Sequence, residues 1–278
     1  CFRCPYGKRF DSCDYYCVDQ FEKLFENECK SVYDPKSKEC EFSAFYIESI
    51  QGTGGYIFPP PEYFKRLKKI LDRYGIYLVD DEIQMGFYRT GKFWALEHFG
   101  VKPDVIVFGK ALTNGMNPLS GFWAKEELMK KDAFPPGSTH STFSSNPMGT
   151  AAGFEVMNAL NAKNLERQIH LSGKKFLSML KKLQKKYKVI CDVDGRGLAF
   201  RLEICQNDGI TPNRQLVDRI YQEGLKGNLR YKGKRYGLVL DVGGHHKNVF
   251  TLSPSFYTTD EEIAMAHSFL DELFSRFS

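Results

Sequence analysis

Two short apolar runs, each followed directly by charged side chains, constrain the fold more than any other feature of the sequence. The first run covers residues 76–79 and continues into Asp80 and Asp81, and the second covers 105–108 and continues into Gly109 and Lys110. Such runs are typical of buried strands in an α/β sheet. Because the carboxyl ends of strands form the ligand crevice of open α/β sheets, we expect a carboxylate and an amine at the same edge.

Lysine and aspartate at neighbouring strand ends have two interpretations. Their spacing alone fits two solvated charges, which are common at such positions. A lysine in a partly apolar pocket, however, has a lowered pKa and can attack a carbonyl to form a Schiff base. An aspartate can keep a pyridinium nitrogen protonated. The pair is therefore also what a pyridoxal phosphate enzyme requires.

The stretch from 81 to 110 reads DEIQMGFYRTGKFWALEHFGVKPDVIVFGK. It resembles the signature of the class III aminotransferases, a pyridoxal-phosphate family with the aspartate-aminotransferase fold. The match is dense and in order: an acidic pair, a glutamine, an Arg-Thr-Gly triplet, a Gly-Val-x-Pro-Asp segment and the lysine. The resemblance extends more weakly over most of the chain.

This resemblance implies a role for each candidate site residue. Lys110 would hold pyridoxal 5'-phosphate as a Schiff base and act as the catalytic acid and base, and Asp81 would pair with the ring nitrogen. Ile83 would pack on the ring, and Gln84 would hydrogen-bond its phenolic oxygen. Thr142 matches a family threonine that binds the cofactor phosphate of the neighbouring subunit. No metal ligand is implied.

The implied function is transfer of an amino group from an amino acid or amine to a 2-oxo acid, in a homodimer with a shared active site. An amino-acid racemase or epimerase of the same family is an alternative, because it needs the same lysine and aspartate. A third possibility is a catalytically inactive fragment.

The same resemblance predicts the architecture. Residues 1–160 are expected to form the C-terminal part of a three-layer α/β/α large domain, and residues 161–278 an α+β small domain. The family's Gly/Ser-rich phosphate loop and its ring-stacking aromatic have no counterpart in the sequence. We therefore expect an N-terminally truncated family member whose cofactor affinity is reduced.

Two positions depart from the family pattern together. Many relatives carry a glutamate in the glycine loop that pairs with an arginine before the last helix, and the arginine binds an α-carboxylate. Here the two positions are Thr53 and Thr251. The paired loss is self-consistent and predicts a different substrate pocket, for which Arg201 and Arg230 are weak candidates as carboxylate partners.

Charge and hydropathy exclude some other functions. The net charge is only +5, and the lysines cluster at 174–188 among apolar residues at helical spacing. This pattern predicts an amphipathic helix with a solvated basic face rather than a nucleic-acid or membrane site. No apolar run is long enough to span a bilayer and no signal peptide is visible, so we expect a cytoplasmic protein.

Eight cysteines leave one question open. Cys1, Cys4, Cys13 and Cys17 have a spacing that could hold zinc, although free thiols are the simpler interpretation. Relatives carry a similar opening segment without needing a metal. Disulfides are not expected, because nothing in the sequence argues for an oxidising compartment.

Local patterns predict several further elements. Helices are expected over 19–28, 62–74 and 125–131, and a strand over 236–240. Residues 259–262 read Thr-Asp-Glu-Glu, a capping box that predicts the start of the last helix.

Overall fold

The computed structural model describes residues 2–26, 32–130, 132, 134–161 and 164–277. Its contacts divide the chain into two compact units. Unit 1 comprises Cys1–Ile50, Phe58–Phe87 and Phe93–Asn161, and unit 2 comprises Gln51–Ile57, Tyr88–Lys92 and Ala162–Ser278. Two short segments from the first half of the sequence thus pack with the C-terminal part of the chain.

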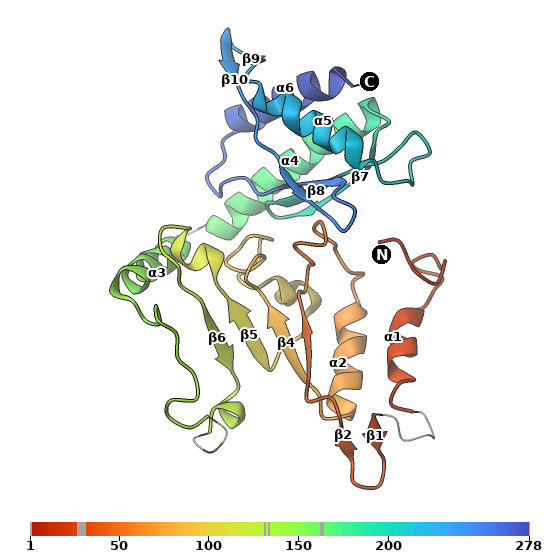
Figure 1. The fold of residues 1–278 in the computed structure, drawn as a ribbon, viewed down its shortest axis with the longest axis vertical. Helices are drawn as coiled ribbons and strands as arrows, with labels where there is room; N and C mark the ends of the chain where they lie inside the picture. Colours follow the sequence, from red (N-terminus) through yellow and green to blue (C-terminus); the bar gives the residue numbers. More distant parts are fainter. Residues whose placement is uncertain (1, 27–31, 131, 133, 162–163, 278) are drawn as a thin grey trace. The chain divides into compact units, whose positions relative to one another are not determined.

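Unit 1 is built on a four-stranded sheet with the order β3-β4-β5-β6 (Figure 1). The strands are β3 (Ala44–Ile47), β4 (Tyr77–Asp81), β5 (Val105–Phe108) and β6 (Gly121–Ala124). The first three are parallel and β6 is antiparallel to β5. The two predicted strands therefore form adjacent members of one parallel sheet, as the α/β expectation requires.

Helix α2 (Tyr63–Arg73) covers one face of this sheet and closely matches the helix predicted over 62–74. The side chains at 64, 67, 70 and 71 are buried because their three- and four-residue spacing puts them on one side of the helix. Gly75 follows with a φ of 68°, the left-handed conformation that ends many helices.

The other predicted helices of unit 1 need correction. Near the N-terminus, α1 spans Tyr16–Glu22 rather than 19–28, and residues 27–28 lie outside the described part. It ends early because Phe25 is buried and its ring stacks on that of Tyr74, with the ring centroids 4.5 Å apart. The helix expected over 125–131 is the 3-10 turn η3 (Glu126–Met129), and Lys131 is not described.

The remaining elements of unit 1 are short except for one helix. They are the hairpin β1 (Tyr33–Asp34) and β2 (Glu39–Cys40), the 3-10 helices η1 (Ala95–Phe99) and η2 (Lys110–Thr113), and helix α3 (Pro147–Leu160). Asn146 caps α3 by accepting a hydrogen bond from the Gly149 N–H at 2.7 Å.

Unit 2 is an α+β unit around an antiparallel sheet with the order β11-β12-β8-β7. Its elements are α4 (Leu165–Lys186), β7 (Ile190–Arg196), β8 (Ala199–Ile204), α5 (Arg214–Leu225), β9 (Leu229–Tyr231), β10 (Lys234–Tyr236), β11 (Asp241–Gly243), β12 (Val249–Leu252) and α6 (Asp260–Ser275). The strand predicted over 236–240 is wrong, because the Leu238 N–H is taken by the Gly224 carbonyl of α5.

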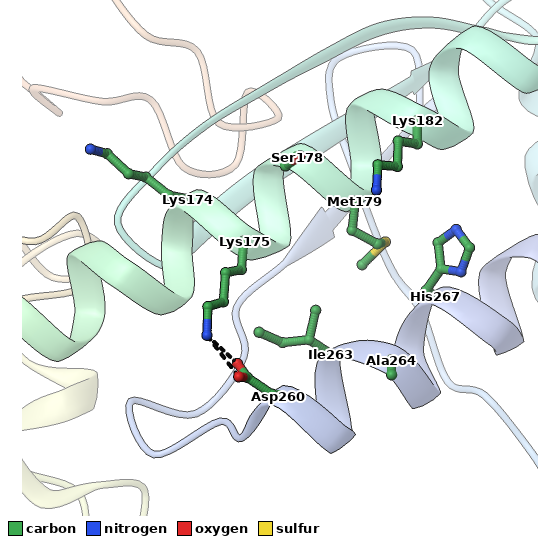
Figure 2. Close-up of a pocket in the computed structure, with 9 residues that line it drawn as sticks. All are labelled: Lys174, Lys175, Ser178, Met179, Lys182, Asp260, Ile263, Ala264 and His267. Atoms are coloured by element: carbon green, nitrogen blue, oxygen red, sulfur yellow. Dashed lines mark hydrogen bonds and ion pairs between the residues drawn. The ribbon is translucent and has the colours of Figure 1, made fainter.

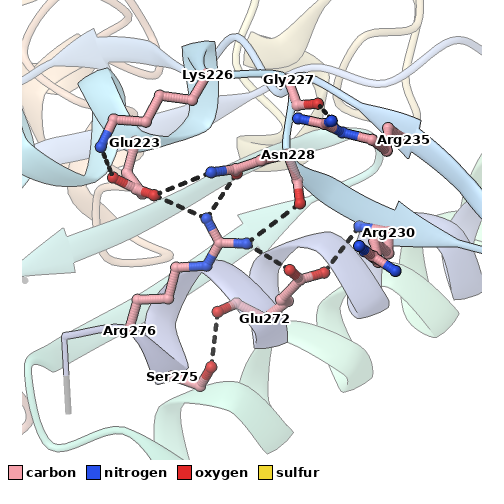
Figure 3. A network of polar contacts seen from close by, with 9 residues as sticks. All are labelled: Glu223, Lys226, Gly227, Asn228, Arg230, Arg235, Glu272, Ser275 and Arg276. Carbon is pink, nitrogen blue, oxygen red and sulfur yellow. Dashed lines mark hydrogen bonds and ion pairs between the residues drawn. The ribbon is translucent and has the colours of Figure 1, made fainter.

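Both long helices of unit 2 follow their sequence patterns. The lysine-rich helix α4 buries Phe176, Leu180 and Leu183 and leaves its lysines exposed. Helix α6 starts with the predicted capping box between Thr259 and Glu262. At its other end Arg276 donates hydrogen bonds to Glu223 and Asn228 and pairs with Glu272, which ties α6 to α5 and the β9 segment (Figure 3).

One expectation about the cysteines is overturned. A disulfide joins Cys191 to Cys205, with the Cα atoms 5.7 Å apart. The two residues lie where β7 and β8 pair with a bulge between Ile190 and Asp192, which places Cys191 out of register. The sequence could not indicate this pairing, because neither the bulge nor the strand register is visible before folding.

No helix in the described ranges is both long enough and apolar enough to cross a membrane.

Candidate functional site

Asp81 is the last residue of β4, at the carboxyl end of the parallel strands of unit 1. Its two carboxylate oxygens have separate partners: Oδ1 accepts a hydrogen bond from the Ile83 N–H at 3.0 Å, and Oδ2 accepts one from the Tyr46 hydroxyl at 2.7 Å. The two contacts fix the orientation of the carboxylate and leave it half-buried. A carboxylate held in this way is a suitable partner for a cationic nitrogen.

Tyr46 is a site residue that the sequence analysis missed. Partial loss of water around its hydroxyl, together with the bond to the Asp81 carboxylate, raises the pKa of Tyr46 to about 12. The signal was available in principle, because side chains alternate along a strand and β3 is paired in parallel with β4. Tyr46 and Asp81 therefore emerge on the same face, but only the register shows that they meet.

Lys110 begins the 3-10 helix η2 directly after β5. Its φ of 40° is a left-handed conformation that a residue other than glycine rarely adopts, and such backbone strain is concentrated at functional sites. The side chain is exposed, and no hydrogen bond or ion pair is found for its amine within the described residues. Because β4 and β5 are adjacent and parallel, Lys110 and Asp81 extend from the same edge of the sheet.

Ile83 and Gln84 follow Asp81 in the turn after β4, and both are half-buried. A Cβ atom placed on Gly109 would lie 3.9 Å from Cγ1 of Ile83, so the Ile83 side chain lies beside the residue that precedes Lys110. The packing of Ile83 on a cofactor ring stays a prediction. The role of Gln84 stays a prediction.

Thr142 lies on an exposed turn that leads into α3. Asn146 holds this turn in place, because its side-chain amide donates to the carbonyls of Pro118 and Phe143 at 3.2 and 3.1 Å. Among the described residues, no hydrogen bond or ion pair joins Thr142 to Asp81 or Lys110. Its assignment to a phosphate therefore stays a prediction.

The substrate positions named from the sequence lie in unit 2. Thr251 is buried and its hydroxyl donates to Asp241, whereas Thr53 is exposed and its carbonyl accepts from the Gly244 N–H at 3.2 Å. Arg201 is unsuitable as a carboxylate partner for a substrate, because it is 2% exposed and pairs with Glu203 and Asp192. Arg230 is exposed on β9 and remains a candidate.

Within the described residues, the ligand atoms of the N-terminal cysteines do not come close enough together to hold a metal ion. Cys4, Cys13 and Cys17 are half-buried free thiols, and Cys1 lies outside the described residues. Within the described part, ligand atoms come close enough to hold an ion at Cys191, Glu203 and Cys205. There the sulfurs are bonded to each other, and the carboxylate of Glu203 is bound by Arg201 and Asn248.

A wide groove of about 610 Å³ lies in unit 2 between α4 and α6 (Figure 2). Lys174, Lys182 and His267 lie at its rim, and Lys175 pairs with Asp260 at 2.6 Å. The lysines are exposed to solvent and the polar lining contains no buried group. We interpret this groove as the solvated face of α4 that the sequence predicts.

The residues of unit 1 fit the group that the sequence suggests. An oriented carboxylate and an exposed primary amine at one sheet edge are the donor set that a pyridine aldehyde requires. A half-buried isoleucine beside Gly109 would give a planar ring an apolar surface.

Comparisons with known proteins agree with this chemistry. The family model described as aminotransferase class-III matches residues 8–274. The leucine/methionine racemase of Thermococcus litoralis is 36% identical over 91% of this chain and 53% of its own length. The acetylornithine aminotransferase of Caldanaerobacter subterraneus is 33% identical over 90% of this chain and 57% of its own length.

Solved structures resemble the chain as well. An amine transaminase from an uncultivated Pseudomonas species, in a PLP-bound form, is 25% identical with a TM-score of 0.83. The match covers 100% of this chain and 60% of that one. The chain therefore has the fold of the pyridoxal-phosphate transaminases but spans only about half the length of the curated relatives it matches.

Proposed function

Because the chain belongs to the class III aminotransferases, we propose that it transfers an amino group from an amino acid or amine to a 2-oxo acid. Pyridoxal 5'-phosphate would supply an aldehyde that carries the amino group and a ring that withdraws electrons from the substrate carbon. The observation that supports this best is the Asp81 carboxylate, held by Tyr46 and Ile83 at the edge from which Lys110 also extends.

Each residue of the site has a defined task in this proposal. Lys110 would bind the cofactor through Nζ and then move a proton to and from the substrate carbon. Asp81 would pair with the ring nitrogen, with its carboxylate oriented by two hydrogen bonds. Ile83 would cover one ring face, and Gln84 would donate to the ring oxygen.

The assembly around the site is also part of the proposal. Residues 1–160 would form the cofactor domain and residues 161–278 the small domain. Thr142 would reach the phosphate of a second subunit in a cytoplasmic homodimer. Its exposure on a turn that Asn146 fixes supports a role toward a group outside unit 1.

Racemisation of an amino acid is the second candidate function. Two relatives at 36% and 35% identity are named as a leucine/methionine racemase and an alanine/serine racemase. A racemase removes and returns one proton at the same carbon, so Lys110 and Asp81 would serve without a 2-oxo acid. The buried Thr251, which donates to Asp241, leaves no cation at that position for an α-carboxylate.

One experiment tests the site and separates the two functions. The chain is incubated with pyridoxal phosphate, reduced with borohydride and mapped by mass spectrometry. We expect the adduct on Lys110 and its loss in Lys110→Ala, whereas Lys125→Ala, which removes a lysine paired with Asp104, keeps the adduct.

The reaction is then measured with and without a 2-oxo acid. Amino transfer to pyruvate or 2-oxoglutarate supports the aminotransferase. Loss of optical activity without a 2-oxo acid supports the racemase. An adduct on other lysines, or none, contradicts the assignment of Lys110 and favours an inactive fragment.

A further inference from the structure

Unit 1 contains an apolar cavity of about 520 Å³ that the proposed function does not use. Strands β4, β5 and β6, the segment 93–103 and helix α3 contribute to its walls. Five aromatic side chains line it: Phe87, Phe93, Trp94, Phe108 and Trp123. Its volume is in the range of small-molecule sites, which are mostly apolar with a few polar groups.

This cavity lies on the opposite side of the sheet from the candidate cofactor site. Asp80 lines the cavity and precedes Asp81 in β4. Because neighbouring side chains in a strand point to opposite faces, Asp80 and Asp81 serve different sides. Ile106 on β5 is the register partner of Asp80, Trp123 on β6 is the register partner of Ile106, and both line the cavity.

The Asp80 carboxyl is the one acidic group at the buried wall of this cavity. It is 0% exposed, and its oxygens lie near the Ser49 backbone and the Glu82 carboxyl without a hydrogen bond of normal geometry within the described residues. Burial and the neighbouring Glu82 carboxyl raise the pKa of Asp80 to about 10. Glu82 is itself buried, and one of its oxygens accepts from the Leu96 N–H at 2.9 Å.

No cationic side chain compensates this pair of acids in the described part of unit 1. The nearby buried carboxylate Asp104, by contrast, pairs with Lys125 and Lys68. Of the other charged residues that line the cavity, Lys102 is exposed and Glu97 accepts from the Trp94 N–H. A buried acid normally has a counter-charge, because taking an unpaired charge out of water is costly.

We propose that this cavity binds an organic cation with an apolar body, an alkyl- or arylammonium whose charge faces Asp80. Aromatic rings attract such cations through their electron-rich faces, most strongly when water is excluded. The cation would replace the proton on the Asp80 carboxyl, which then forms an ion pair with it. One proton is released to solvent for each cation bound at neutral pH.

The cavity carries its own spectroscopic probe. The sequence has two tryptophans, Trp94 and Trp123, and both line the cavity. Phenyltrimethylammonium is a suitable ligand, because it keeps its charge at every pH and cannot react with Lys110. Its uncharged counterpart of the same shape is tert-butylbenzene. We expect the cation to change the tryptophan fluorescence saturably and to bind at least tenfold more tightly than the neutral molecule.

Asp80→Asn keeps the shape of the side chain but cannot become an anion. We expect it to weaken the cation at least tenfold, to abolish proton release and to leave the affinity for tert-butylbenzene unchanged. If this variant does not fold, Trp123→Leu replaces it, because Trp123 is 51% exposed and an aromatic wall is lost with little change in the core. A loss of about threefold or more is then expected.

Three results overturn the proposal. The first is no saturable change of tryptophan fluorescence with the cation, and the second is equal affinity for the cation and the neutral molecule. The third is unchanged cation affinity in Asp80→Asn or, if that variant does not fold, in Trp123→Leu. Lys110→Ala separates this site from the proposed function. We expect Lys110→Ala to lose the borohydride adduct and to bind the cation normally. Loss of cation binding in Lys110→Ala would place the ligand at the cofactor site and would also overturn the proposal.

Discussion

Gly173 gives a direct test of packing in unit 2, because two physical effects predict opposite signs for Gly173→Ala. Glycine inside a helix costs about 1 kcal/mol relative to alanine, so helix propensity alone predicts that the variant stabilises α4. The structure predicts the reverse. A Cβ atom at Gly173 would lie 2.2 Å from the Gly197 carbonyl oxygen and 2.9 Å from its carbonyl carbon.

The turn at Gly197 has no room to move away. A Cβ atom on Gly197 would lie 2.3 Å from the Thr90 carbonyl carbon, so the turn is enclosed by backbone on that side as well. Overpacking of this kind costs about 1–3 kcal/mol. After the gain in helix propensity is subtracted, we expect Gly173→Ala to lower the free energy of unfolding of unit 2 by up to about 2 kcal/mol.

The matched control is Gly153→Ala in α3, where a Cβ atom would meet its nearest neighbours at 3.4–3.7 Å, an ordinary contact distance. This variant is expected to gain up to about 1 kcal/mol. Urea unfolding is followed by far-ultraviolet circular dichroism for the whole chain and by tryptophan fluorescence for unit 1, which contains Trp94 and Trp123. An increase in the urea midpoint for Gly173→Ala, as in Gly153→Ala, would refute the packing argument.

Three further outcomes follow from the structure. Asp81→Asn should bring the pKa of Tyr46 down from about 12. The titration is followed by phenolate absorbance, and the signal of Tyr46 is identified as the part that Tyr46→Phe removes. An unchanged pKa of Tyr46 would mean that the hydrogen bond to Asp81 does not contribute to it. Burial raises the pKa of Asp104, but the contacts with Lys125 and the Leu78 N–H outweigh it and lower that pKa. The ionised Asp104 therefore stabilises the fold fully above the unfolded-state pKa of about 4. This stabilisation is lost as the pH falls through the lower pKa of the folded state. Asp104→Asn should therefore reduce stability by about 1–3 kcal/mol at pH 7 and flatten the acid limb of a melting-temperature profile, and equal acid limbs would contradict this. Reduction of the disulfide between Cys191 and Cys205 should lower the stability of unit 2 by up to about 3 kcal/mol, with Cys205→Ser as the control that no longer responds to the reductant.

The parallel part of the fold was predictable because its signals are local. The strand at 105–108 is found as predicted, and α2 differs by one residue at each end from the prediction. In both cases the apolar spacing and the residues at the ends agree with the final structure. The class III resemblance related these elements to a known family, and the family match over residues 8–274 confirms that resemblance.

The features that the sequence did not indicate depend on register between distant segments. The bond from Tyr46 to Asp81 requires β3 and β4 to pair in parallel with one particular alignment. The disulfide requires a bulge in β7. The strand predicted over 236–240 failed because a carbonyl of α5 takes the Leu238 N–H, a tertiary contact that no local pattern contains.

The signature stretch itself divides into two physical roles. Asp81 and Ile83 belong to unit 1 and shape the edge beside Lys110, whereas Arg89 and Thr90 belong to unit 2. The Arg89 guanidinium donates to the Leu198 and Pro254 carbonyls at 3.3 and 2.8 Å. The Leu198 N–H donates to the Arg89 carbonyl at 2.9 Å.

These contacts give the Arg-Thr-Gly part of the signature a packing role in unit 2. Gly197 packs so closely on Thr90 that no side chain fits between them. Arg89 binds the next residue, Leu198, through both its carbonyl and its guanidinium. A resemblance in sequence therefore does not distinguish the residues beside Lys110 from the residues that pack unit 2, because both belong to the same signature. The structure separates them, because Asp81 and Lys110 lie at one edge of the sheet of unit 1, whereas Arg89 and Thr90 pack against the Gly197 turn in unit 2.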